Sequence, residues 1–137
     1  MNRNKILENR KKVIAFLKDS SRQKHKGSLE NIDNTEERCC LGHMCAALNI
    51  QREAYNHCIH YDTEGAIAPE SLVNMVGLNG QSGTIRNLYR YKNQRYLGLT
   101  DLNDHSDITP QEIGAYLESV IEGGPNSPWR SLNEYTE

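Results

Sequence analysis

Apolar residues that recur with the period of an α-helix limit the fold of this chain more than any other feature of its sequence. In residues 4–19 they return at spacings of three, four and seven, which aligns them as one stripe on a helix. The members of this stripe are Ile6, Leu7, Val13, Ile14 and Leu17. The Lys and Arg residues between them are predicted to lie on the solvated side. The same period in residues 39–48, 69–76 and 110–121 predicts three further helices.

The last of these helices has the clearest start and stop signals. Thr109 stands at the N-cap, Pro110 at the first helical position and Glu112 at the third, which is the pattern of a capping box. Two glycines and a proline at positions 123–125 are expected to end the helix. Its predicted buried face consists of Ile113, Leu117, Val120 and Ile121.

The remaining segments predict only short elements. Residues 22–38 are polar and are expected to form a loop with one short turn of helix. Residues 84–91 and 95–100 are expected to form two strands. The predicted fold class is therefore α+β and α-rich, with about four helices around one core and a small antiparallel β-hairpin near residues 84–100.

The composition bears on the size of the core and on the organisation of the chain. Leu, Ile, Val and Phe make up only 28 of the 137 residues, but the net charge of −2 lacks the self-repulsion that usually accompanies disorder. We expect one globular domain over residues 1–124 and a polar C-terminal tail over residues 125–137. In this tail Trp129 is expected either to dock on the domain or to bind a partner. No apolar run near the N-terminus is long enough for a transmembrane span or a signal peptide.

The cysteines lack the spacing of a disulfide framework, which indicates reduced thiols in a cytosol. They are Cys39, Cys40, Cys45 and Cys58. Because Cys40 and Cys45 lie on the apolar side of the helix predicted over residues 39–48, we expect both thiols to be buried and structural.

An alternative function for these thiols is nucleophilic catalysis. A cysteine at a helix N-terminus gains thiolate character from the helix dipole, and a histidine nearby can act as its base. The protein would then be a cysteine-dependent hydrolase or transferase that uses Cys39 or Cys40, with His57 and Asp104 as the supporting catalytic residues.

A second alternative is a zinc-stabilised interaction module. Zinc takes four thiolate or imidazole ligands, and the candidates here are His43, His57, Cys58 and His60. The spacing contains neither a CxxC nor an HxxxH pair, so we predict that there is no structural zinc and no other cofactor.

Charge is distributed unevenly along the chain. Residues 1–26 contain nine Lys or Arg and two acids, whereas residues 97–137 contain eight acids and one Arg. Such asymmetry is typical of a nucleic-acid surface or of a surface for an acidic partner. It is equally expected where a basic face packs against the protein's own acidic segment.

Basic and aromatic residues alternate in residues 84–96, a stretch without an acid. Basic side chains neutralise phosphates and aromatic rings stack on bases, so this mixture suits a nucleotide or a nucleic acid. A pI near 6.2 argues against a dedicated non-specific DNA-binding protein. We expect the binding surface to consist of Arg86, Tyr89, Arg90, Tyr91, Lys92 and Arg95.

Three segments of the chain resemble, in the same order, an uncharacterised family of short bacteriophage proteins. Residues 38–45 are similar to the family's CCLGxxC helix, and residues 67–78 to its LPxxVxxWLGL helix. Residues 99–104, followed by residues 109–121, are similar to its LND segment and closing helix. Departures from the pattern are Arg38 and Met75 where the family often has aromatic residues, and His43 where it usually has an aliphatic one.

The resemblance implies a small accessory protein, encoded by a phage and located in the cytoplasm of the infected host cell. We expect a non-enzymatic binding protein that acts in host takeover or anti-defence. Its expected partner is a host protein or a nucleotide-type ligand, with nucleic acid as an alternative and no membrane. The oligomeric state does not follow from these motifs.

Overall fold

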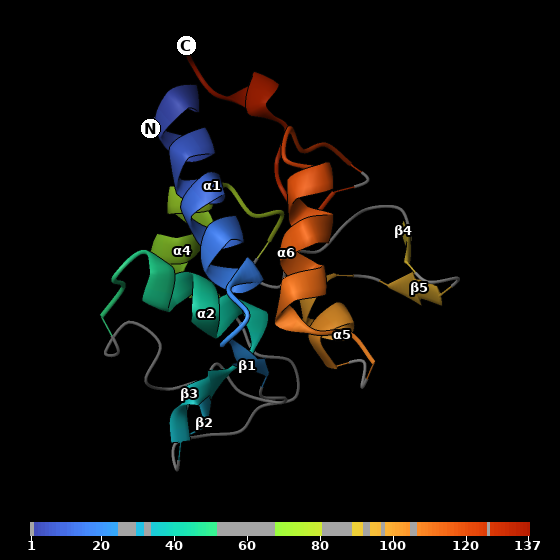
Figure 1. The fold of residues 1–137 in the computed structure, drawn as a ribbon. Coiled ribbons are helices and arrows are strands. Elements are labelled where there is room, and N and C mark those ends of the chain that lie inside the picture. The colour runs from blue at the N-terminus through green and yellow to red at the C-terminus, as the bar shows by residue number, and fades with distance from the viewer. Residues whose placement is uncertain are drawn as a thin grey trace.

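The computed structural model describes residues 2–24, 30–31, 34–51, 68–80, 89–91, 94–96, 98–104, 107–125 and 127–137, with only the backbone at 30–31, 34–35, 89–91, 94–96 and 100. Its helices are α1 (Arg3–Lys18), α2 (Cys40–Ala47), α4 (Glu70–Val76), α5 (Leu99–Asp104), α6 (Pro110–Ser119) and the 3-10 turn η2 (Leu132–Glu134). Helix α1 is central and packs against α6, α2 and α4 (Figure 1). The helix-rich class expected from the sequence is confirmed. Among the described residues, no helix combines the length and apolarity that crossing a membrane requires.

Local end signals place α4 and α6 where the sequence predicts them. The Thr109 side chain accepts a hydrogen bond from the Glu112 amide at 3.1 Å, as a capping box requires. At the C-terminal end of α4, Gly77 has φ 69°, which is the left-handed conformation that glycine adopts without strain. Both signals act within one turn of helix, which is why the sequence alone locates them.

A small sheet replaces the loop expected over residues 22–38. Its strands are β1 (Gln23–Lys24), β2 (Glu30–Asn31) and β3 (Asn34–Arg38), with β3 in the middle. β3 pairs in parallel with β1 and antiparallel with β2. The expectation of a loop with a helical turn was wrong because strands this short contain no alternation that a sequence could reveal.

The second sheet consists of β4 (Tyr89–Tyr91) and β5 (Gln94–Tyr96), which pair antiparallel. It lies within residues 84–100 but does not extend to residue 100. Helix α5 begins at Leu99, so the strand predicted over residues 95–100 was too long. Leu99 and Leu102 are both fully buried. Residues three positions apart lie on the same face of a helix but on opposite faces of a strand, so this burial fits a helix.

The segment after Pro125 packs against the domain, and of the two alternatives expected for Trp129 the structure shows the docked one. Trp129 is fully buried, and its indole N–H donates to the Leu117 carbonyl at 3.1 Å. The side-chain nitrogen of Asn79 donates to the backbone carbonyls of Ser127 and Trp129 at 2.8 and 3.0 Å. One indole ring with a hydrogen-bonded tip is enough to anchor a segment that otherwise looks polar.

Arg10 contradicts the expectation that the basic residues of α1 are solvated. Its side chain is fully buried, because it stands four residues after Ile6 and four before Ile14, on the apolar stripe itself. The guanidinium donates to four backbone carbonyls, those of Val76, Gly77, Ile121 and Arg130, at 2.7, 3.2, 2.7 and 2.7 Å. Arg10 therefore joins α1 to the ends of α4 and α6 and to the C-terminal segment.

Candidate functional site

The hairpin β4–β5 holds the described part of the binding surface predicted from the sequence. Arg90 and Arg95 are register partners, and so are Tyr89 and Tyr96. Because facing residues of an antiparallel pair share a face and successive residues alternate, both arginines stand on one face of the hairpin. Tyr89, Tyr91 and Tyr96 stand on the other. The structure therefore separates the basic positions from the aromatic ones, while Arg86 and Lys92 lie outside the described residues.

Exposed acidic residues follow the hairpin along the chain, in α5 and in the turn after it. This helix follows β5 after two residues, and Figure 1 shows the hairpin beside it at the periphery of the fold. Asp101 and Asp104 of α5 are exposed, and so is Asp107 in the turn that follows. The basic stretch is thus followed along the chain by an acidic one.

Two basic residues of the N-terminal helix α1 form ion pairs with acidic residues from the C-terminal part of the chain. Lys18 and Glu118 form an ion pair at 3.0 Å, and Arg3 and Glu137 form another at 3.1 Å. Both pairs are solvent-accessible, so each contributes little to stability. They do show that part of the charge asymmetry is internal to the molecule.

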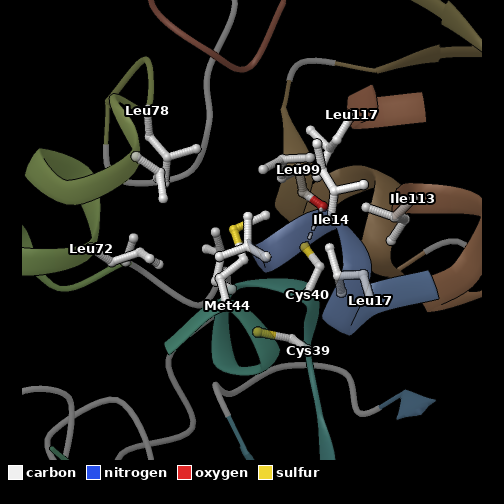
Figure 2. Packing of buried hydrophobic residues seen from close by; sticks show 14 of the residues in the cluster. Ile14, Leu17, Cys39, Cys40, Met44, Leu72, Leu78, Leu99, Ile113 and Leu117 are labelled. Carbon is white, nitrogen blue, oxygen red and sulfur yellow. Dashed lines mark hydrogen bonds between the residues drawn. The ribbon is translucent and has the colours of Figure 1, made fainter. Parts of the chain in front are cut away.

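The cysteines of α2 are buried, as predicted for Cys40 and Cys45. Figure 2 shows Cys40 pointing toward Ile14 of α1 and Leu99 of α5, whereas the Cys39 sulfur is turned toward α2 itself. Relative exposures are 3% for Cys39, 1% for Cys40 and 0% for Cys45, and none of these three cysteines is in a disulfide. Burial, followed by the neighbouring Cys39, raises the pKa of the Cys40 thiol well above its usual value. A thiol with a raised pKa is a poor nucleophile at neutral pH.

The LND segment is joined directly to the start of α2. Asn103 is buried, and its side-chain oxygen accepts a hydrogen bond from the Cys40 amide at 2.9 Å. The Cys40 thiol donates to the Leu99 carbonyl at 3.7 Å (Figure 2). Two of the motifs on which the family resemblance depends therefore contact each other, and the contact caps a helix N-terminus.

The proposed catalytic residues do not assemble into a reactive site in the described residues. Asp104 lies near Cys40, but its charge contributes to raising the pKa of the thiol, the opposite of activation. The Cys39 sulfur accepts a hydrogen bond from the Gly42 amide at 3.4 Å, as an N-cap. His57, the third candidate, lies outside the described residues.

His43 is the one zinc candidate that the structure describes, because His57, Cys58 and His60 lie outside the described residues. Its Nε2–H donates to the Gln23 carbonyl at 2.6 Å, and its ring tilts against Phe16 with centroids 5.9 Å apart. No group of three or more potential ligands is found in the described part of the chain. His43 instead joins α2 to β1, and burial, against the opposing hydrogen bond, lowers its pKa to about 4.

We expect His43 to make stability fall with acidity. The unfolded chain binds a proton at this residue near pH 6.5, whereas the folded protein does so only near pH 4. Stability from His43 is therefore complete above pH 6.5 and is lost as the pH falls to about 4, by roughly 3 kcal/mol in all.

Urea unfolding of the wild type and of His43→Gln at several pH values measures this contribution. The variant keeps a donor for the Gln23 carbonyl but does not titrate, so the difference between the two proteins should shrink as the pH falls through this range. A constant difference would show that the His43 pKa is not lowered in the folded state.

Sequence reasoning missed Asn103 as the cap of α2 and Arg10 as the connection among three segments. The apolar positions of Ile6 and Ile14 on either side of Arg10 were a usable signal for its burial. Nothing local indicated that Asn103 would reach residue 40. Comparisons with protein-family models, with curated proteins and with solved structures each found no match.

Proposed function

We propose that this protein is a non-enzymatic binding protein whose β4–β5 hairpin recognises a negatively charged host partner, a protein or a nucleotide-type ligand. By its motif resemblance, we place it among phage-encoded accessory proteins that act in the cytoplasm of an infected cell, in host takeover or anti-defence. The observation that carries the proposal is the register of the hairpin, which sets Arg90 opposite Arg95.

Two like charges directly opposite each other destabilise a strand pair. An anion placed between or above them removes that repulsion, and guanidinium groups bind carboxylate and phosphate in a bidentate manner. Residues 84–96 contain no acid, so no residue of this stretch can provide the neutralising negative charge. A bound anionic partner is therefore the arrangement that this register favours.

The state of the thiols supports binding over catalysis. Cys40 is buried, its pKa is raised, and its hydrogen bond goes to the Leu99 carbonyl. Cys39 is engaged as an N-cap. Both interactions hold α2 in place, so the residues favoured for a nucleophile already have structural roles.

The proposal is tested by reversing the two charges in Arg90→Glu/Arg95→Glu. Binding is measured by fluorescence anisotropy with three labelled probes: a polyglutamate peptide, oligo(dT) and ATP. We expect the wild type to bind at least one of them and the variant to bind it about tenfold more weakly or worse. Binding should also weaken with added salt, because salt screens exposed charges.

A matched control is Lys11→Glu/Arg130→Glu, which changes the net charge equally at two other exposed positions. It should bind as the wild type does, and both double variants should keep the melting temperature of the wild type. The proposal is wrong if none of the probes binds. It is also wrong if the Arg90→Glu/Arg95→Glu protein melts many degrees lower while binding per folded molecule is unchanged.

A further inference from the structure

We infer that the partner of the hairpin is a protein that adds an extended, acidic strand along the outer edge of β4. This inference rests on the proposed function and names the kind of partner. Backbone hydrogen bonds would provide affinity, and the alternating faces of the hairpin would select the sequence of the added strand.

The first argument is the size of the sheet. β4 and β5 form a two-stranded sheet, and among the described strands neither has a second neighbour. Two strands alone are marginally stable in water, and a third strand or a packed face is what usually stabilises them. β5 continues toward α5 and contacts it, whereas Figure 1 shows β4 farther from that helix. The outer edge of β4 is therefore the one we assign to the partner.

The second argument is the alternation within the hairpin. Arg90 is the central residue of β4 and shares a face with Arg95, while Tyr89 and Tyr91 stand on the opposite face. A strand beside β4 lies about 5 Å away and places its own residues on the same two faces. It fits best with an acidic residue opposite Arg90 and apolar residues on either side, opposite the tyrosines.

The third argument separates a protein from a nucleic acid. A nucleic acid carries a charge at every nucleotide and needs a basic surface as long as the bound segment. Here the helix that contacts β5, α5, carries the exposed Asp101 and Asp104, and the exposed Asp107 follows it, so an extended polyanion that continued past the hairpin onto this helix would meet acids. Arg and Tyr are also the residue types that are enriched at the centres of protein interfaces.

The test uses five probes with the full-length wild-type chain. Three of them are a peptide of alternating Asp and Val, a peptide of the same composition with all Asp residues first, and oligo(dT). The other two are N-methylated forms of the alternating peptide, one methylated on the Asp amides and one on the Val amides. Because successive amides of a strand point to opposite edges, each methylated form blocks one edge only.

We expect the alternating peptide to bind about tenfold more tightly than the peptide with all Asp residues first. Of the two methylated forms, one should bind and the other should not. Hydrogen exchange at residues 89–91 should slow when the alternating peptide is bound. Equal binding of both methylated forms, or equal loss in both, would overturn the added strand. Charge-dependent binding of oligo(dT) alone would overturn it too and would leave the proposed function standing. If reversal of Arg90 and Arg95 affects no probe, the proposed function itself fails.

Discussion

Replacing Arg10 with methionine is expected to lower the free energy of unfolding by about 4 kcal/mol. The substitution keeps an unbranched side chain of similar length but removes the donors to four buried or partly buried carbonyls. Each buried acceptor that loses its partner costs roughly 1–3 kcal/mol, and regaining the desolvation energy of the cation offsets part of the sum.

Among the residues that the structure describes, no carboxylate pairs with the charge of Arg10. Burial lowers its pKa to about 10, so the guanidinium remains protonated at neutral pH. The carbonyls of Val76 and Gly77 close α4, and that of Ile121 follows the end of α6. Since the C-terminal end of a helix carries partial negative charge, two helix ends provide the counter-charge. No single acid therefore marks this site in the sequence.

Urea unfolding of Arg10→Met beside Lys11→Met measures the effect. Lys11 is the next residue of the same helix and is exposed, so its substitution should change stability by no more than about 0.5 kcal/mol. Arg10→Lys should remain strongly destabilised, because one ammonium with three donors cannot reach four carbonyls. Equal stability of the Met variants at positions 10 and 11 would show that these hydrogen bonds do not hold the fold together.

Elements whose signals are local were predicted well. The capping box of Thr109 and Glu112 starts α6, and Gly77 ends α4, because these contacts span at most one turn. The apolar stripe of α1 was equally visible, with Leu7 as its one partly exposed member. Burial of Cys40 and Cys45 followed from the same periodicity.

Elements that depend on distant contacts were not predicted. α5 has six residues and is defined by Leu99 and Leu102 reaching the common core, a contact that no local pattern reveals. β1 owes its position to a parallel pairing with β3, more than ten residues away. In the candidate site, the sequence indicated the basic and aromatic residues of the hairpin. Their separation onto two faces required the register of Arg90 with Arg95.

Trp129→Ala is expected to cost about 4 kcal/mol, comparable to Arg10→Met. The indole is fully buried, and its ring centroid lies 5.0 Å from the Arg10 guanidinium carbon. Removing it opens a cavity between Leu117 and Arg10 and releases the anchor of the C-terminal segment. Trp129→Phe keeps most of the ring but loses the hydrogen bond to Leu117, so it should cost only about 1–2 kcal/mol.

A double-mutant cycle with Arg10→Met decides whether the two side chains act as one unit. Arg10 donates to the carbonyl of Arg130, the residue after Trp129. Removing the indole therefore loosens a carbonyl that Arg10 binds, and removing the guanidinium loosens the backbone that holds the indole. The double variant should therefore be about 1–3 kcal/mol more stable than the sum of the single effects predicts. Additive effects would mean that the indole and the guanidinium stabilise separate parts of the fold. Coupling would mean that the buried Arg10 cation and Trp129 hold α1 and the C-terminal segment together as one cooperative unit.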